Sequence, residues 1–226
     1  KIGGEIGRCV HSERETHSDY VAHLISTIDC DLSGLRVMVD CANGAAAATA
    51  PQLFRQLPIM ADFISIDPDG VNINADCGST HMETLASMTV AGKYDLGIAF
   101  DGDADRCLLV DEQGNMIDGD KVLAVCAAKL RREGKLTNDT IVATVMSNLG
   151  LHEYCRNENL ALICTAVGDR NVLEKMLEDD YALGGEQSGH TIFREYATTG
   201  DGQLTALQFL CALVQSGKKA SELVSC

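Results

Sequence analysis

The sequence predicts an α/β fold made of two consecutive α/β domains, with mixed, largely parallel sheets flanked by helices. Short β-branched apolar runs alternate along the chain with stretches of helical period, which is typical of parallel sheets covered by helices. The chain has 226 residues, of which 46% are hydrophobic, enough for two packed cores. We expect the first domain to span residues 1–115 and the second to span residues 116–226.

In the first domain, strands are predicted at 35–40, 61–66 and 95–100. The first strand leads through Ala42-Asn43-Gly44 into an alanine-rich helix that ends near Leu57. The second strand is closed by the turn at 67–70. A helix is expected after Ser79, a candidate N-cap with Glu83 nearby, and should end near residue 91.

The polar turn at 111–115 separates the two halves. The predicted order in the second half is a helix at 122–130, a strand at 140–145, a helix at 149–157, a strand at 161–165, a helix at 171–177, a strand at 181–183 and a last helix from 201 to 214.

Charge and cysteine content narrow the class of protein. The formal net charge of -15 opposes binding to nucleic acid or to an anionic membrane surface, because both require a basic face. No apolar run approaches the roughly 18 residues of a membrane span, so we expect a cytoplasmic protein. Ten cysteines are scattered without a C-x-x-C pair. We expect them to be reduced and structural, with Cys41 and Cys164 as small apolar side chains of strands.

The acidic loop, residues 101–106, is the strongest chemical signal. It places Asp101, Asp103 and Asp105 at alternate positions directly after an apolar strand. Their mutual repulsion is relieved most simply by a divalent cation, and all-oxygen ligands favour Mg²⁺ or Ca²⁺ over zinc. An EF-hand is excluded because Arg106 stands where that loop needs glycine. The alternative is a solvated acidic turn, which gives no reason for this spacing between apolar flanks.

The glycine-rich loop, residues 184–190, also follows a short predicted strand. Its glycines let a ligand approach the backbone, while Glu186, Ser188 and His190 offer hydrogen-bonding groups suited to sugar hydroxyls. A structural turn is the alternative, since glycine-rich polar loops are common.

Together the two loops, DGDADR (101–106) and GEQSGH (185–190), resemble those of the α-D-phosphohexomutases, and the chain is most similar to the phosphoglucosamine mutases among them. The further matching segments are VDCANGA (39–45), PDGVNINADCGSTH (68–81), TVMSNLGL (144–151), AVGDRNVLEKM (166–176) and TTGDGQLTALQ (198–208). The resemblance covers almost the whole chain and implies the second and third of four domains around one cleft.

The resemblance implies a role for each site residue. Asp101, Asp103 and Asp105 would bind Mg²⁺ with a phosphoserine, and Arg106 would brace that phosphoserine. Glu186 and Ser188 would hold sugar hydroxyls. His190 would relay a proton near the reacting oxygen, or it would only hydrogen-bond backbone. Arg170 would touch phosphate in the cleft, or it would be a surface arginine paired with a neighbouring acid.

The implied reaction interconverts glucosamine 6-phosphate and glucosamine 1-phosphate through a phosphoserine and a bisphosphorylated intermediate. The chain contains neither a serine loop of the T-A-S-H-N-P kind nor an R-x-S-G-T-E phosphate clamp. The resemblance places these in flanking domains, which would be partners of this chain along with the phosphorylated hexosamine. We therefore expect the chain alone to be inactive. A phosphoglucomutase or phosphomannomutase, a non-catalytic sugar-phosphate-binding module and a homodimer all remain open.

Overall fold

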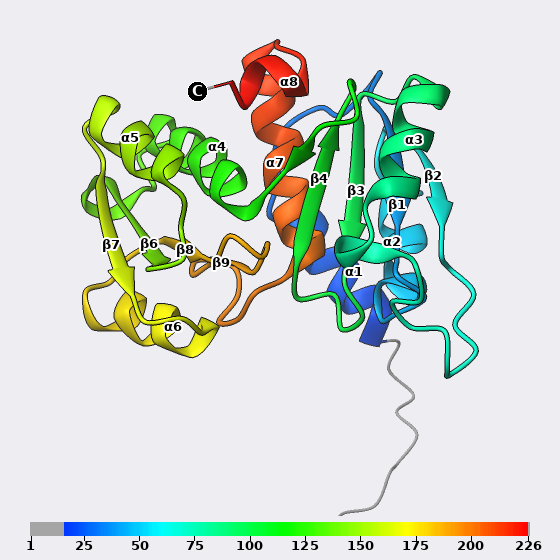
Figure 1. The fold of residues 1–226 in the computed structure, drawn as a ribbon, viewed down its shortest axis with the longest axis horizontal. Helices are drawn as coiled ribbons and strands as arrows, with labels where there is room; N and C mark the ends of the chain where they lie inside the picture. Colours follow the sequence, from blue (N-terminus) through cyan, green and yellow to red (C-terminus); the bar gives the residue numbers. More distant parts are fainter. Residues whose placement is uncertain (1–15, 226) are drawn as a thin grey trace, which may run out of the picture.

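Two mixed sheets organise residues 16–225, the part of the chain that the computed structural model describes (Figure 1). The first has the strand order β2-β1-β3-β4-β5 and the second β7-β6-β8-β9. The strands are β1 (Arg36–Asp40), β2 (Met60–Ile64), β3 (Leu96–Phe100), β4 (Cys107–Asp111), β5 (Met116–Ile117), β6 (Thr140–Thr144), β7 (Ala161–Thr165), β8 (Leu183–Gly185) and β9 (Thr191–Phe193). The helices are α1 (Thr16–Ser26), α2 (Ala46–Phe54), α3 (Glu83–Gly92), α4 (Gly119–Arg132), α5 (Leu149–Asn157), α6 (Asp169–Glu178), α7 (Gly202–Ser216) and α8 (Ala220–Leu223).

The two sheets repeat one pattern of pairing. Strands β2, β1 and β3 are parallel and β4 runs antiparallel to β3; likewise β7, β6 and β8 are parallel and β9 runs antiparallel to β8. The predicted fold class, two α/β domains with largely parallel sheets, is confirmed. The hairpins β3–β4 and β8–β9 occupy equivalent places, and they carry the acidic loop and the glycine-rich loop.

Helices cover both faces of each sheet, as Figure 1 shows. Helix α3 packs on one face of the first sheet, and α2, α1 and α7 lie on the other. In the second sheet, α4 and α5 cover one face and α6 the other. The alternation along β1 follows from this arrangement: Val37 and Val39 enter the main core, while Met38 faces α3.

Helix α7 lies between the sheets and contacts both of them. Its buried side chains share one continuous core with strands of the first sheet and of the second. The two α/β units are therefore joined through packed apolar side chains, not only through the chain connection. Strand β5 completes the first sheet and α4 begins the second unit, so the change of sheet falls between residues 117 and 119.

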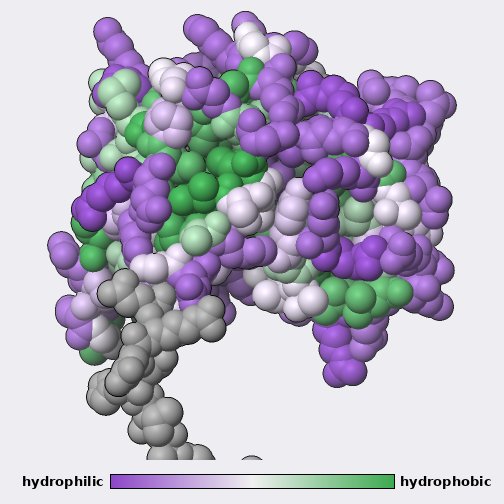
Figure 2. Space-filling model, turned by 180° about the vertical axis from the view of Figure 1, so that it is seen from behind, coloured by the Kyte–Doolittle hydropathy of each residue, from purple (hydrophilic) through white to green (hydrophobic). Residues whose placement is uncertain are grey.

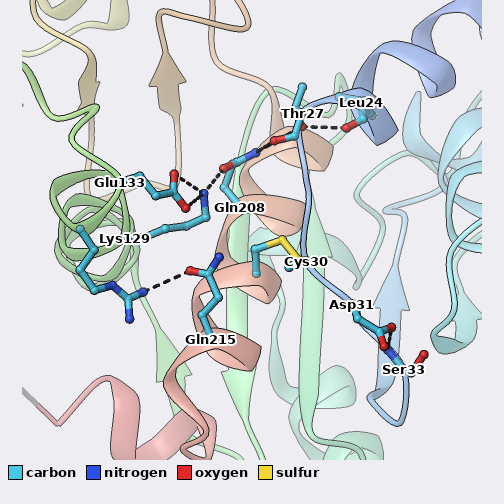
Figure 3. Close-up of a disulfide and its surroundings, with 11 residues drawn as sticks. Leu24, Thr27, Cys30, Asp31, Ser33, Lys129, Glu133, Gln208 and Gln215 are labelled. Atoms are coloured by element: carbon cyan, nitrogen blue, oxygen red, sulfur yellow. Dashed lines mark hydrogen bonds and ion pairs between the residues drawn. A yellow bond between two sulfur atoms is a disulfide. The ribbon is translucent and has the colours of Figure 1, made fainter.

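A disulfide and a polar network attach the segment before β1 to α7 (Figure 3). The disulfide joins Cys30 to Cys211, so the expectation of reduced cysteines is wrong for this pair. Two cysteines so distant in sequence give no local signal of pairing. Of the others, Cys41 is buried as expected, but Cys164 is exposed on β7. Cys9 and Cys226 lie outside the described residues.

Several boundaries differ from the sequence prediction. Ser79 is not the N-cap of α3, because it lies in the 3-10 turn Gly78–Thr80 and the helix starts at Glu83. Strand β8 contains two glycines, which have low strand propensity, so the predicted strand at 181–183 ends too early. Helices α4 and α6 begin earlier than predicted, at Gly119 and Asp169.

The face opposite to that of Figure 1 is largely polar, with an apolar area bounded by polar residues (Figure 2). Among the helices of residues 16–225, none combines the length and the apolar character that a membrane crossing needs.

Candidate functional site: an acidic loop joined to a glycine-rich loop

The acidic loop turns the chain from β3 into the antiparallel β4, and it is tightly folded. The carbonyl of Asp101 accepts from the N–H of Ala104 at 3.2 Å, and its Oδ1 accepts from the N–H of Arg106 at 3.1 Å. Ala104 adopts a left-handed conformation, with φ of 62°. These contacts turn the three aspartates toward one centre.

The three predicted aspartates come together. One carboxylate oxygen from each of Asp101, Asp103 and Asp105 lies within 4.8 Å of the others. Asp101 is 8% exposed and Asp103 is exposed. The Nε of Arg106 lies 3.7 Å from Asp101 Oδ2 and 3.8 Å from Asp105 Oδ1. One guanidinium therefore pairs with two of the three clustered carboxylates, and the cluster keeps a net negative charge.

The net negative charge of the cluster affects the pKa of Asp101. Burial, reinforced by Asp105 and Asp103, raises its pKa to about 6, against the opposing hydrogen bond from the N–H of Arg106. A carboxyl group in such surroundings binds either a proton or a cation more readily than an isolated one.

The donor set fits a hard divalent cation. The Oδ1 of Asp105 is withdrawn from solvent and accepts no hydrogen bond within the described residues. A buried carboxylate oxygen that accepts no hydrogen bond, and whose ion pair with Arg106 Nε is 3.8 Å long, is costly. Three carboxylates close together supply the all-oxygen environment that Mg²⁺ prefers.

The VDCANGA segment (39–45) packs against the acidic loop. The N–H of Ala45 donates to the carbonyl of Gly102 at 2.9 Å. A Cβ at Gly44 would overlap that carbonyl, and a Cβ at Gly102 would press on Asn74 at 2.8 Å. Glycine is required at position 44 because the backbone of Gly102 lies directly against it, whereas a Cβ at position 102 would meet side chains.

The glycine-rich loop is fixed by hydrogen bonds from two neighbouring segments. The Oε1 of Glu186 accepts from the N–H of Gly168 at 3.1 Å. The carbonyl of Gln187 accepts from the N–H of Gly119 at 2.9 Å. Ser188 is exposed at the tip of the loop. The loop thereby presents polar groups from a rigid base.

The two loops meet directly. The N–H of Cys107 donates to the carbonyl of Gly189 at 3.1 Å, and Arg106 and His190 form an isolated antiparallel bridge. Two hollows lie beside this junction. One, of about 600 Å³, is lined by Arg106, Glu186 and Ser188 together with apolar side chains. The other, of about 510 Å³, is lined by Asp103 and Asp105.

His190 lies inside the junction. Its Nδ1 is 3.1 Å from Asp105 Oδ2, and its Nε2 accepts from the N–H of Gly200 at 3.0 Å. The residue is 3% exposed.

Arg170 lies apart from these groups. Its side chain is 86% exposed on α6 and forms an ion pair with Glu174 at 2.8 Å. Of the two interpretations of Arg170, this arrangement corresponds to the paired surface arginine.

Sequence reasoning did not single out Asp118, which contacts the glycine-rich loop through Gln187. As the N-cap of α4 it accepts from Lys121 N, and its Oδ2 accepts from the side chains of Asn148 at 3.3 Å and Gln187 at 3.4 Å. An aspartate directly before a helix is an N-cap signal, and this signal could have identified it.

Two α/β units of repeated strand order, joined at an acidic hairpin loop and a glycine-rich hairpin loop, have the fold of the phosphohexomutase class. The chain belongs to the phosphoglucomutase/phosphomannomutase family: the model of its alpha/beta/alpha domain II matches residues 18–114, and that of its alpha/beta/alpha domain III matches residues 118–226.

Curated relatives cover nearly the whole chain. A phosphoglucosamine mutase of Acetivibrio thermocellus is 54% identical over 223 residues, which is 99% of this chain and 49% of that protein. One of Clostridium novyi is 52% identical over 223 residues, again 99% of this chain and 49% of the relative. The chain thus spans about half the length of the curated relatives it matches.

Solved structures share the fold. A phosphoglucomutase/phosphomannomutase family protein from Burkholderia thailandensis superposes with a TM-score of 0.80 at 26% identity, over 92% of this chain and 46% of that one. An N-acetylphosphoglucosamine mutase of Aspergillus fumigatus does so with a TM-score of 0.73 at 18% identity, over 93% and 49%. The second likeness concerns the fold alone.

Proposed function

We propose that this chain forms the metal-binding and sugar-binding centre of a phosphoglucosamine mutase, which interconverts glucosamine 6-phosphate and glucosamine 1-phosphate through a phosphoserine and a bisphosphorylated sugar. The observation that carries the proposal is the shared hollow, in which Arg106 of the acidic loop and Glu186 and Ser188 of the glycine-rich loop face one space. The names of the relatives at 54% and 52% identity support this substrate. The reactive serine and the phosphate clamp belong to flanking domains in this proposal.

Each residue of the hollow has a chemical part in the proposal. The side chain of Arg106 is 45% exposed, so it can still donate to phosphate oxygens while it faces the aspartates. Glu186 accepts hydrogen bonds from sugar hydroxyls, and Ser188 donates or accepts. Several weak contacts suit a sugar that must bind in either orientation. Arg170 is left out, because it pairs with Glu174 on the solvent side of α6.

In this proposal Asp101, Asp103 and Asp105 hold Mg²⁺. The protein to which the chain belongs is a cytoplasmic enzyme. Bound there, Mg²⁺ would neutralise negative charge on a transferring phosphoryl group. The A. fumigatus structural neighbour was solved with GlcNAc-6P and magnesium, which supports a metal of this kind.

Calorimetry with Mg²⁺ tests the metal site. We expect weak binding by the chain, because Mg²⁺ prefers about six oxygen ligands and the aspartates supply only part of them. Asp103→Ala should abolish binding without unfolding the chain, since Asp103 is exposed. Glu153→Ala removes an equal charge from the exposed face of α5 and should leave binding unchanged. Equal binding by Asp103→Ala and the control would refute the metal site.

Turnover assays test the reaction. The chain alone should not convert glucosamine 6-phosphate, whereas the full-length protein should convert it in preference to glucose and mannose phosphates. Preference for glucose or mannose phosphates would instead indicate a phosphoglucomutase or phosphomannomutase. Binding of sugar phosphates without any turnover by the full-length protein would indicate a non-catalytic module.

A further inference from the structure

We infer that a cavity bordered by Lys93, Lys218 and Lys219 binds an organic anion that combines a phosphate group with an apolar body. This lysine cavity is separate from the hollow of the proposed function. Two observations carry the inference: the three ammonium groups have no acidic partner within the described residues, and apolar side chains form much of the wall around them.

The lysine cavity lies at the edge of the first sheet that is opposite to the acidic loop. It has a volume of about 650 Å³ and is bounded by the residues before β1, the end of α3 and the turn between α7 and α8. The end of α3 and helix α8 lie on this side of the sheet, at the top of Figure 1. The acidic loop follows the other end of β3, a five-residue strand that is roughly 15 Å long. A ligand in the lysine cavity and a sugar phosphate beside Arg106 therefore do not overlap.

The lysines of this cavity differ from most others in the chain because they are unpaired. Residues 16–225 contain seven lysines, and Lys129, Lys135 and Lys175 each form an ion pair with a glutamate. The other four form no ion pair with a carboxylate of the described residues, and three of these four border the lysine cavity. Three unpaired cations gathered in one place, in a protein with a net charge of -15, favour an anion from outside the chain.

The two acids in the wall of the cavity are already engaged. The Oε2 of Glu112 accepts from the N–H of Ser221 at 3.1 Å, and its Oε1 accepts from the Ser221 hydroxyl. The Oδ2 of Asp95 accepts from the backbone N–H of Arg36 at 2.8 Å. The guanidinium of Arg36 lies 4.9 Å from the ring centroid of Tyr94, which lines the cavity. The wall therefore carries three positive and two negative charges, with a further cation beside it.

The backbone at Lys93 supports a role for its side chain. Lys93 ends α3 in the left-handed conformation, with φ of 54°, where glycine or asparagine is usual. Helix α7 ends in the same conformation at Gly217, with φ of 65°. A lysine at this position strains the backbone, and it supplies an ammonium group that glycine would not.

The apolar part of the wall defines the rest of the ligand. Leu35, Val90 and Tyr94 line the cavity together with Leu213 and Val214. Val90 is 47% exposed, so a ligand can cover apolar surface that now faces water. Ammonium groups act as point charges that suit phosphate, and the volume lies in the range of small-molecule sites. An organic phosphate with an apolar body satisfies both parts of the wall.

Amide ¹H–¹⁵N spectra of the chain, recorded during titration with phenyl phosphate, test the site. Inorganic phosphate lacks the apolar body and phenol lacks the charge, so these two compounds are the matched probes. We expect phenyl phosphate to shift the amide signals of Lys93, Gly217 and Lys219 and to bind more tightly than either matched probe.

Three outcomes of the titration would overturn the inference. Phenyl phosphate could leave the spectrum unchanged. Its shifts could be confined to the acidic loop and the glycine-rich loop, which would place the probe only in the hollow of the proposed function. Inorganic phosphate or phenol could bind as tightly as phenyl phosphate, which would remove the need for a charged and apolar ligand. None of these outcomes depends on mutase activity.

Substitution of the lysines tests their part in binding. The triple variant Lys93→Gln/Lys218→Gln/Lys219→Gln should bind phenyl phosphate about two- to fivefold more weakly for each lysine removed. Lys121→Gln is the matched control, because Lys121 is also unpaired within the described residues but lies on α4, outside the cavity. Equal affinities of the triple variant and this control would overturn the assignment of the lysines.

Lys93→Gly separates binding from folding. Glycine adopts the left-handed conformation without strain, so thermal unfolding should show no loss of stability. The variant lacks one ammonium group and should bind phenyl phosphate about two- to fivefold more weakly. Unchanged affinity would remove Lys93 from the site and contradict the inference.

Discussion

The polar network that joins α4, α7 and the segment before β1 gives the sharpest test of the packing (Figure 3). Gln208 is fully buried. Its Oε1 accepts from Lys129 Nζ at 3.0 Å, and its Nε2 donates to the carbonyl and hydroxyl oxygens of Thr27 at 3.1 and 3.2 Å. Lys129 is also buried and pairs with Glu133 at 3.0 Å.

Gln208→Leu should destabilise the chain by about 1–3 kcal/mol, the cost of leaving a buried polar group without its hydrogen bond. Thr27 loses the donor Nε2, whereas Lys129 keeps its pairing with Glu133. Lys129→Met should also destabilise. The double variant should cost less than the sum by about 0.5–3 kcal/mol, since replacing both partners with apolar groups removes the unmet hydrogen bond.

Urea unfolding followed by circular dichroism measures these differences. Gln215→Leu is the matched control on the same helix, because Gln215 is exposed, and it should stay within about 0.5 kcal/mol of the wild type. A Gln208→Leu chain as stable as this control, or additive effects of the two core substitutions, would refute the coupling.

Three further predictions concern a covalent link, a close approach and a buried carboxyl group. Reduction of the Cys30–Cys211 disulfide, which spans 181 residues, should lower the unfolding free energy by up to about 5 kcal/mol on a chain-entropy estimate; unchanged urea midpoints with and without reductant would contradict this. Gly119→Ala should cost about 1–3 kcal/mol, because a Cβ there would overlap backbone atoms of the glycine-rich loop; thermal unfolding at or above the wild-type temperature would refute it. Burial raises the pKa of Asp201, so protonation of Asp201 favours the folded state; this contribution to the unfolding free energy is complete below about pH 4 and is lost as pH rises through the raised pKa. Urea unfolding across pH should show that Asp201→Asn lacks this loss of stability. Parallel pH profiles of Asp201→Asn and the wild type would contradict the assignment.

Apolar periodicity was sufficient to predict most of the fold. Strands such as β1 and β6 are short and apolar at their three central positions, so both their presence and their parallel pairing follow from the alternation with helices. The remaining elements were missed or misplaced because their local sequence signals are weak. Helix α1 buries only Val21 and Leu24, and it was not predicted. The mistaken N-cap at Ser79 arose because Glu83 stands nearby, whereas a capping box requires a spacing of three residues.

The residues of the candidate site also divide into those that the sequence could predict and those that it could not. The aspartates of the acidic loop are close in sequence, so their spacing alone predicts that they meet. The contacts of His190 are not local: Asp105 lies 85 residues away and Gly200 lies 10 residues away. Only the folded chain brings them together. The pair Arg170–Glu174, by contrast, has the spacing of helical neighbours, and sequence alone could have predicted it.

The position of α7 in one core with both sheets has a consequence for ligand binding. The separation of Arg106 from Glu186 is fixed when the chain folds, because their loops are hydrogen-bonded together and their sheets pack on the same helix. This part of the site is preorganised. A sugar phosphate entering the hollow therefore spends none of its binding free energy on bringing these two domains together.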